Sequence, residues 1–292
     1  MIYLRKLKFL LKNSIDILDY YLFRINKQYE NYETVILIAS MGRSGSTLLS
    51  EIINFNNEYK ELFEPFISTK VNEVSNFTYP TSLKKTSKSQ IHFLQAKRVI
   101  SGHIDNRWVN QLKRRKNINK LLIKDIRVNF FLGWLKTNFS SIKVILLIRD
   151  PLKTIKSWQN AGFDNGDIEY QFLRKKYYSM LSVEQQKIFN EADSSFKKLI
   201  ILWCLTYFIP ISEMTKSEYL LVKYEDILRD NLDALRLYLD DVSLKYTIKP
   251  SRTSSLSYKL KKYNNHLSAE DLIYLKKAIK LFGLDSLYNY SK

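Results

Sequence analysis

Residues suited to anion binding gather in the stretch "VILIASMGRSGSTLLSEII", which runs from Val35 to Ile53. An apolar run there ends at two glycines, hydroxyl side chains and an arginine, and the pattern then becomes helical. Glycines let a backbone turn tightly, and the free N–H groups at the start of a helix face an anion. Such a loop surrounds a phosphate or sulfate group with backbone amides. Taken alone, the loop also fits a plain Gly/Ser turn between a strand and a helix.

This loop differs from the phosphate-binding loop of ATPases and kinases. That loop follows the pattern G-x-x-x-x-G-K-[ST], in which the lysine reaches the transferred phosphate. Here the loop is shorter, and no lysine precedes the hydroxyl pair Ser46 and Thr47. The cation is Arg43, which stands before the second glycine. A kinase-like phosphotransferase is therefore an alternative, but this sequence lacks the lysine that defines that class.

A second candidate stretch is "VILLIRDPLKTIKSW", from Val144 to Trp158. It is another apolar run, and it ends at Arg149, Asp150 and Pro151. Proline suits the first turn of a helix, and Ser157 lies eight residues beyond the arginine. Both stretches thus place a cation at the carboxyl end of a predicted strand, where parallel α/β sheets bind their ligands.

Together the two stretches resemble the sulfotransferases that use 3′-phosphoadenosine-5′-phosphosulfate (PAPS). Members of that family pair a loop for the 5′-phosphosulfate with a downstream strand and an Arg…Ser motif for the 3′-phosphate. The resemblance implies that the 5′-phosphosulfate is held by Arg43, Ser44, Gly45, Ser46 and Thr47. It also implies that Arg149 and Ser157 hold the 3′-phosphate. Tyr224, in "YLLVKYEDILRDNLDALRLYL", matches the tyrosine that approaches the cofactor in the family.

Shorter segments extend the likeness. "LFEPF" (62–66) is similar to the Phe-Glu-Pro segment of carbohydrate sulfotransferases, and "LLIKDIRV" (121–128) is similar to their Lys…Arg strand. The resemblance implies transfer of a sulfuryl group to an acceptor hydroxyl without a metal ion. It favours a saccharide acceptor, such as a polysaccharide or glycolipid. Arg43 is then a catalytic residue as well, because it is aimed where negative charge develops. Lys124 and Arg127 are candidates for contact with cofactor or acceptor, with a purely structural role as the alternative.

An alcohol becomes a good nucleophile only when a base takes its proton. Glu64 is the leading candidate for this base, and the alternative is that Glu64 pairs with a basic residue and orders its segment. The proline that follows predicts an extended backbone at Glu64. His103, in "VISGHID", is the second candidate base, and Asp125 is the third.

Composition limits the function classes. The 292 residues include one cysteine and three histidines, which excludes a disulfide framework and a cysteine-based zinc site. The formal net charge of +18 fits an anionic ligand, an anionic acceptor, nucleic acid or an acidic membrane surface. No nucleic-acid motif accompanies the charge, so no nucleic-acid partner is expected. A non-catalytic polyanion-binding protein, whose binding falls steeply with salt, is the second alternative.

Apolar runs alternate with helical patterns along the chain. Strands are predicted at 34–40, 98–101, 120–125, 143–149 and 219–224. Helices are predicted at 46–56, 128–138, 151–160, 167–190, 194–216, 225–239 and 268–282. Continuous apolar strands suit a parallel sheet that is covered on both faces. The predicted fold is an α/β domain with a P-loop-type central parallel sheet flanked by helices.

The predicted organisation is one sulfotransferase domain at 34–292, preceded by an amphipathic helical segment at 1–33. Charges interrupt the N-terminal segment, so it has no unbroken span of about 20 apolar residues. It suits packing on its own domain or peripheral contact with a membrane. We expect a cytoplasmic protein. The segments 66–95 and 161–192 are expected to line the acceptor side, and 66–95 and 240–265 are predicted to be irregular.

Overall fold

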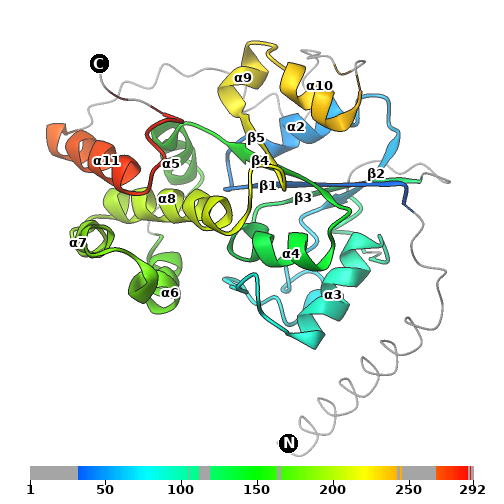
Figure 1. The fold of residues 1–292 in the computed structure, drawn as a ribbon, viewed down its shortest axis with the longest axis horizontal. Helices are drawn as coiled ribbons and strands as arrows, with labels where there is room; N and C mark the ends of the chain where they lie inside the picture. The colour runs from blue at the N-terminus through cyan, green and yellow to red at the C-terminus, as the bar shows by residue number, and fades with distance from the viewer. Residues whose placement is uncertain are drawn as a thin grey trace, which may run out of the picture.

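The computed structural model describes residues 32–104, 106–111, 119–162, 166–241, 244, 268–288 and 290. Within these residues, helices cover both faces of a central sheet (Figure 1). The predicted N-terminal helical segment lies outside the described residues, apart from its last two positions. Nearly all of the predicted irregular segment beyond 241 lies outside them as well.

The sheet has five parallel strands in the order β2-β3-β1-β4-β5. They are β1 (Thr34–Ser40), β2 (Tyr59–Phe63), β3 (Lys120–Asp125), β4 (Lys143–Ile148) and β5 (Leu220–Lys223). The chain leaves β1 towards β2 and β3 on one side and later returns to add β4 and β5 on the other. The carboxyl end of β1 is therefore a switch point of the topology, where open α/β sheets bind ligands. The predicted fold class is confirmed.

Helices fill both faces of the sheet. They are α2 (Ser46–Ile53), α3 (Gln90–Ile100), α4 (Leu132–Asn138), α5 (Pro151–Gln159), α6 (Asp167–Tyr177), α7 (Val183–Asn190), α8 (Ser195–Glu213), α9 (Tyr224–Leu228), α10 (Asp233–Leu239) and α11 (Ala269–Leu281). Successive strand side chains point to opposite faces. Leu37 of β1 accordingly packs in the core beneath α3, α4 and α8, whereas Ile36 packs in the core with α2, α9 and α10 (Figure 1).

Helix α8 forms the centre of the larger core. Of the described helices, it alone is long and apolar enough to cross a membrane, with a mean hydropathy of 1.3, and 67% of that stretch is buried inside the protein. Such burial is typical of a core helix. Cys204 on α8 is buried, and this burial raises the pKa of its thiol. Its thiolate, the reactive form, is therefore disfavoured.

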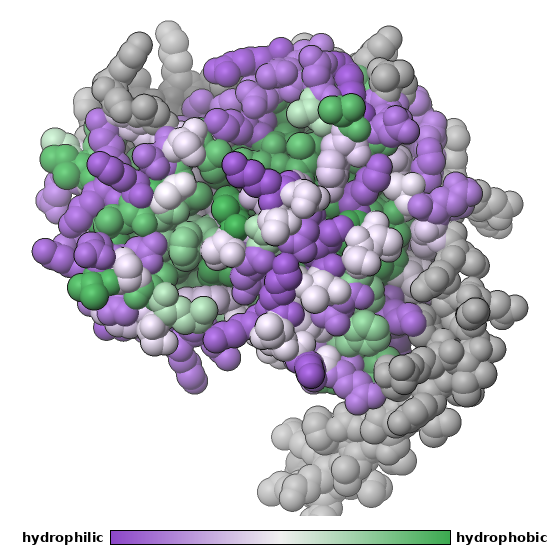
Figure 2. Space-filling view, in the orientation of Figure 1, coloured by the Kyte–Doolittle hydropathy of each residue, from purple (hydrophilic) through white to green (hydrophobic). Residues whose placement is uncertain are grey.

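Hydrophobic residues are visible between hydrophilic ones on the side of the molecule where α6, α7 and α11 lie (Figure 2). Exposed apolar side chains on these helices include Ile168, Val183 and Ile273. Singly exposed apolar side chains are normal on protein surfaces and need no functional explanation.

The structure differs from the sequence prediction in three places of this part of the fold. Residues 98–101, predicted as a strand, form the end of α3, because Ala96 and Val99 bury one face of a helix there. Strand β2 was not predicted, since Lys60 and Glu61 interrupt its apolar run at the edge of the sheet. The segment 66–95, predicted to be irregular, also contains the first turns of α3.

Glu213, the last residue of α8, gives the stability a pH dependence. Its Oε2 atom is buried and has no hydrogen-bond partner within the described structure, and burial raises its pKa from 4.5 to about 7. Between these values the folded protein holds more protons than the unfolded chain, so its stability falls as the pH rises. We expect Glu213→Gln to raise the melting temperature at pH 8 by about 2–4 °C, and to change it little at pH 5. Thermal melts at the two pH values measure this.

Glu218 provides the matched control, because Lys85 Nζ contacts both its carboxylate and the backbone carbonyl of Glu213. Its carboxylate lies 3.1 Å from Lys85 Nζ, and hydrogen bonds from Thr215 lead the causes that lower its pKa. Glu218→Gln should therefore leave the melting temperature at pH 8 unchanged or lower it. If the melting temperature at pH 8 rises equally in both variants, the general removal of negative charge stabilises the protein, and the burial of Glu213 is not the cause.

Candidate active site

Five loops meet at the carboxyl edge of the sheet. Residues 41–45 follow β1, Glu64 follows β2, Arg127 follows β3, Arg149 follows β4, and Tyr224 follows β5. All five strands run in the same direction, so their carboxyl ends lie along one edge. This edge brings together nearly all residues that the sequence analysis selected.

The loop after β1 has the backbone that anion binding requires. Arg43 and Gly45 have φ values of 67° and 93°, in the left-handed region. Gly45 is the N-cap of α2 and provides no side-chain cap, so the first N–H groups of the helix are left to face a ligand. Ser46 and Thr47 begin the helix, as predicted.

Two aromatic residues support this loop from beneath. The Tyr207 hydroxyl of α8 accepts a hydrogen bond from Met41 N–H at 3.3 Å and lies 3.1 Å from Ser44 Oγ. The Trp158 Nε1–H group of α5 donates to the Gly42 carbonyl at 2.7 Å. The hydroxyl of Ser44 is thus buried against Tyr207. Sequence reasoning missed the supporting role of both aromatic residues, although Trp158 closes the second candidate stretch.

The two candidate stretches form one site. Arg149 Nη1 donates to the Arg43 carbonyl at 2.9 Å, and Arg43 Nε donates to Ser157 Oγ at 3.2 Å. The Arg149 guanidinium also lies 4.6 Å from the ring centroid of Tyr224. That ring packs on Gly45, since a Cβ atom built there would lie 2.3 Å from Tyr224 Cδ2. Arg149, Ser157 and Tyr224 are therefore all neighbours of the loop.

Arg149 carries an unused hydrogen-bond donor. Its Nε atom is buried and has no partner within the part of the chain that the structure describes. A buried donor without an acceptor costs about 1–3 kcal/mol, and more for a charged group. Guanidinium forks match phosphate oxygens. The residues at this end of the site therefore fit a phosphate group.

The C-terminal segment braces the same region. Tyr290 donates from its hydroxyl to Asp150 Oδ2 at 2.7 Å, and Tyr288 donates to Glu225 Oε2 at 2.7 Å. Glu225 Oε1 accepts from the Asp150 N–H at 3.2 Å. The segment thus holds the residues that follow Arg149 and Tyr224. Nothing in their sequence spacing could have linked these residues.

Removing both tyrosine hydroxyls should loosen this end of the site. We expect the double substitution Tyr288→Phe and Tyr290→Phe to raise the dissociation constant of adenosine 3′,5′-bisphosphate by up to about 30-fold, since each of the two hydrogen bonds contributes about 1 kcal/mol. Calorimetric titration measures the change. Tyr219→Phe is the control, because burial rather than a carboxylate partner raises the pKa of that phenol. If the double variant binds the bisphosphate as tightly as the wild type does, the two tyrosine hydroxyls do not brace the site.

Glu64 lies between two cations. Its Oε1 atom is 2.9 Å from Lys124 Nζ, and its Oε2 atom is 2.8 Å from Arg127 Nη1. Burial opposes ionisation of this carboxyl, which is only 7% exposed, but the two cations outweigh it and lower its pKa. Glu64 is therefore ionised at neutral pH. The geometry confirms the hypothesis of an ion-pair partner. The role of Glu64 as a base stays a prediction.

The backbone at Glu64 is not extended, so that prediction is wrong. Its φ value is 43°, in the left-handed region. The Glu64 N–H donates to the Lys124 carbonyl at 2.7 Å, and its carbonyl accepts from Trp108 Nε1 at 3.3 Å. These contacts override the preference of a residue before proline for extended backbone. Conformations of this kind cost about 1–3 kcal/mol and cluster at functional sites.

Asp125, the third candidate base, organises the backbone around Glu64. It is fully buried, and its carboxylate accepts hydrogen bonds from Phe66 N–H at 2.8 Å and Arg127 N–H at 2.7 Å. Burial raises its pKa to about 6. Both carboxylate oxygens are thus engaged by main chain on either side of Glu64, which makes Asp125 a positioning residue.

His103, the second candidate base, lies elsewhere. Its Nδ1 atom is 2.7 Å from Ser101 Oγ, and the preceding carbonyl of Gly102 accepts from Lys60 Nζ at 2.6 Å. Lys60 is the second residue of β2, whereas Glu64 follows the last. Burial and the charge of Lys60 lower the pKa of His103. The contacts thus place His103 beside the amino-terminal half of the strand.

The fold and the site define an α/β protein of the P-loop type, whose loop and downstream arginine are built to hold anionic groups. The family model described as the sulfotransferase family matches residues 35–247. This match spans more than half of the chain, which therefore belongs to the sulfotransferase family. The protein is an enzyme of sulfuryl transfer, and the family generally uses PAPS as donor. The kinase-like and non-catalytic alternatives are set aside.

Solved structures with a similar fold are also sulfotransferases. The sulfotransferase domain of the Synechococcus PCC 7002 olefin synthase is 16% identical, with a TM-score of 0.48, over 89% of this chain and 96% of that one. A sulfotransferase from Alicyclobacillus acidocaldarius is 9% identical, with a TM-score of 0.44, over 88% and 96%. A mouse sulfotransferase complexed with PAP is 15% identical, with a TM-score of 0.30, over 78% and 65%. No curated protein matches significantly. The family assignment rests on the family model.

Proposed function

We propose that this enzyme takes a sulfuryl group from PAPS and transfers it to a hydroxyl of a saccharide, such as a polysaccharide or glycolipid. One observation carries the cofactor assignment. Arg43 contacts both Arg149 and Ser157, and the Nε atom of Arg149 is buried without a partner in the described structure. The loop and the Arg149 region can therefore hold the two ends of one nucleotide.

Each part of the site has a defined task in this proposal. The N–H groups at the start of α2, with the hydroxyls of Ser46 and Thr47, hold the 5′-phosphosulfate. Arg149 and Ser157 hold the 3′-phosphate, and Tyr224 keeps Arg149 in place through its ring. Ser44 shapes the loop through its contact with Tyr207.

The reaction is an in-line displacement at sulfur. The acceptor oxygen forms a bond to sulfur while the bond between sulfur and the bridging phosphate oxygen breaks, and the electron pair of that bond stays on the phosphate. Arg43 and the loop amides are fixed donors at the oxygen where this charge develops. Loss of one such donor typically costs about 2.7–4 kcal/mol of transition-state stabilisation.

Glu64 is the proposed base that takes the proton of the acceptor hydroxyl. Lys124 and Arg127 hold the carboxylate in place and keep it ionised. Support for a saccharide acceptor comes from the Phe-Glu-Pro segment, and the net charge of +18 suits an acceptor that is anionic. Cytoplasmic location and peripheral membrane contact stay predictions from the sequence.

Calorimetric titration of adenosine 3′,5′-bisphosphate, in buffer without magnesium, tests the cofactor assignment. We expect wild type to bind it at least about 100-fold more tightly than AMP, which lacks the 3′-phosphate. Arg149→Ala should remove this preference, and Arg43→Ala should weaken binding. Arg174→Ala, on α6, is the control and should bind as wild type does. Equal binding of the two nucleotides by wild type would refute the proposal.

A further inference from the structure

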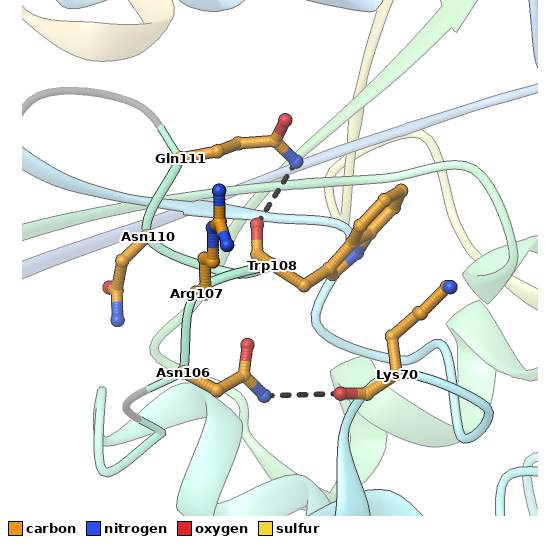
Figure 3. Close-up of a pocket in the computed structure, with 6 residues that line it drawn as sticks. All are labelled: Lys70, Asn106, Arg107, Trp108, Asn110 and Gln111. Carbon is orange, nitrogen blue, oxygen red and sulfur yellow. Dashed lines mark hydrogen bonds between the residues drawn. The ribbon is translucent and has the colours of Figure 1, made fainter.

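We propose that a groove beside β2 is the acceptor subsite and that it binds a saccharide carrying negative charge, an inference that rests on the proposed function. The groove has a volume of about 910 Å³, within the range of ligand sites. Its lining consists of Lys70, Asn106, Arg107, Trp108, Asn110 and Gln111 (Figure 3). The expected acceptor segments 66–95 and 161–192 contribute only Lys70 to it.

The groove adjoins the proposed base. Trp108 Nε1 donates to the backbone carbonyl of Glu64 at 3.3 Å, so a residue that lines the groove is in direct contact with the proposed base. The Phe63 N–H donates to the Val109 carbonyl at 3.0 Å, which ties the lining segment to the end of β2. The Trp108 ring also meets the Phe63 ring edge-on, with centroids 5.5 Å apart. The groove therefore lies next to the end of β2, directly beside the backbone of Glu64.

The lining has the chemistry that recognises a charged sugar. An indole ring offers a flat apolar surface with a polar edge, which suits the C–H face of a pyranose. Lys70 Nζ lies 5.9 Å from the ring centroid of Trp108, and its side chain extends towards that ring (Figure 3). Lys70 and Arg107 are both exposed cations, and among the described residues that line the groove there is no carboxylate. The charge of the groove therefore matches a carboxylate or sulfate on the saccharide.

Internal hydrogen bonds fix the shape of the groove. Asn106 donates from Nδ2 to the Lys70 carbonyl at 3.4 Å, and its Oδ1 accepts from Val109 N–H at 2.9 Å. Gln111 Nε2 donates to the Trp108 carbonyl at 3.0 Å (Figure 3). Such pre-organisation lowers the entropy lost when a ligand binds.

The test titrates two sugars into protein saturated with adenosine 3′,5′-bisphosphate. The probes are a hyaluronan hexasaccharide, which carries carboxylates, and an uncharged N-acetylglucosamine hexasaccharide. We expect the charged probe to bind at least about 10-fold more tightly. Trp108→Ala should weaken both probes about 10-fold, whereas the double substitution Lys70→Ala and Arg107→Ala should weaken only the charged one.

The matched control is the double substitution Lys276→Ala and Lys280→Ala on α11, which removes the same charge from exposed positions away from the groove. It should bind both probes as wild type does. Absence of hexasaccharide binding by wild type, or equal losses in the groove and control variants, would overturn the inference. So would equally tight binding of a single-stranded DNA of matched charge. Failure of the bisphosphate itself to bind would instead refute the proposed function, so the two failures are distinct.

Discussion

Gly45→Ala is expected to destroy cofactor binding, raising the dissociation constant of adenosine 3′,5′-bisphosphate by at least about 100-fold. A Cβ atom at this position would lie 2.3 Å from Cδ2 and Cε2 of Tyr224, and the φ value of 93° disfavours any side chain. Relief of this clash moves Tyr224, which supports the Arg149 guanidinium. The change therefore acts on both ends of the site. Calorimetric titration of the bisphosphate measures the loss of binding, and thermal melts measure the effect of the clash on stability.

Gly283→Ala separates steric clash from backbone strain. Gly283 also has a positive φ value, 66°, but a Cβ atom there would meet nothing within 4 Å, so only the strain of about 1–2 kcal/mol applies. We expect Gly283→Ala to lower the melting temperature modestly and to leave the bisphosphate affinity unchanged. If both alanine variants bind alike, contact between Gly45 and Tyr224 has no part in forming the site.

Glu64→Gln is expected to lower kcat by about 10²–10⁴-fold while the affinity for the bisphosphate changes little. The amide keeps the shape of the side chain but cannot take the acceptor proton. Because the cations lower the pKa of Glu64, its carboxylate is ionised throughout the neutral range, and this group should add no acid limb to the rate profile there. Transfer of radiolabelled sulfuryl from PAPS to a hexasaccharide, measured across pH, tests both points.

A second substitution distinguishes base from ion-pair partner. Glu64→Gln leaves Lys124 and Arg127 without their carboxylate, and an unpaired buried charge costs about 3–5 kcal/mol. Adding Lys124→Met removes one of these charges and should recover part of the lost stability. If Glu64 is the base, the double variant stays inactive relative to Lys124→Met alone. If the double variant is as active as Lys124→Met, Glu64 acts only by holding its neighbours.

The elements that sequence could predict are those with long apolar runs. Strands β1, β3, β4 and β5 carry such runs because helices cover them on both faces. Edge strand β2 contains Lys60 and Glu61, so its apolar signal is too weak to read. At 98–101, branched apolar residues favoured a strand locally, but the burial of Ala96 and Val99 on one helical face decided the structure. In both segments the secondary structure is decided by tertiary packing and not by the local preference of the residues for strand or helix.

The residues of the candidate site also divide into those that the sequence could predict and those that it could not. Residues 43–47 and Arg149 follow strands directly, and Ser157 lies in the helix that comes next, so strand–loop–helix patterns reveal them. The supports of the loop, Tyr207 and Trp158, act through contacts between residues that are far apart in the chain. Their types and spacing carry no signal of that role. The left-handed backbone at Glu64 was unpredictable for the same reason, since contacts from β3 and Trp108 impose it.

The hydrogen bond from Arg149 to the Arg43 carbonyl joins positions that are 106 residues apart. No short segment can form this site by itself, because β1 and β4 must first pair side by side. Closing such a long loop costs entropy before any contact compensates for it, so assembly of the site belongs to the late, slow part of folding. A nucleotide that bridges the two arginines then binds only the folded state, and at 100 times its dissociation constant it adds about 2.7 kcal/mol of stability to the whole sheet. A ligand held by both arginines would thereby protect the whole sheet against unfolding as well as occupy the site.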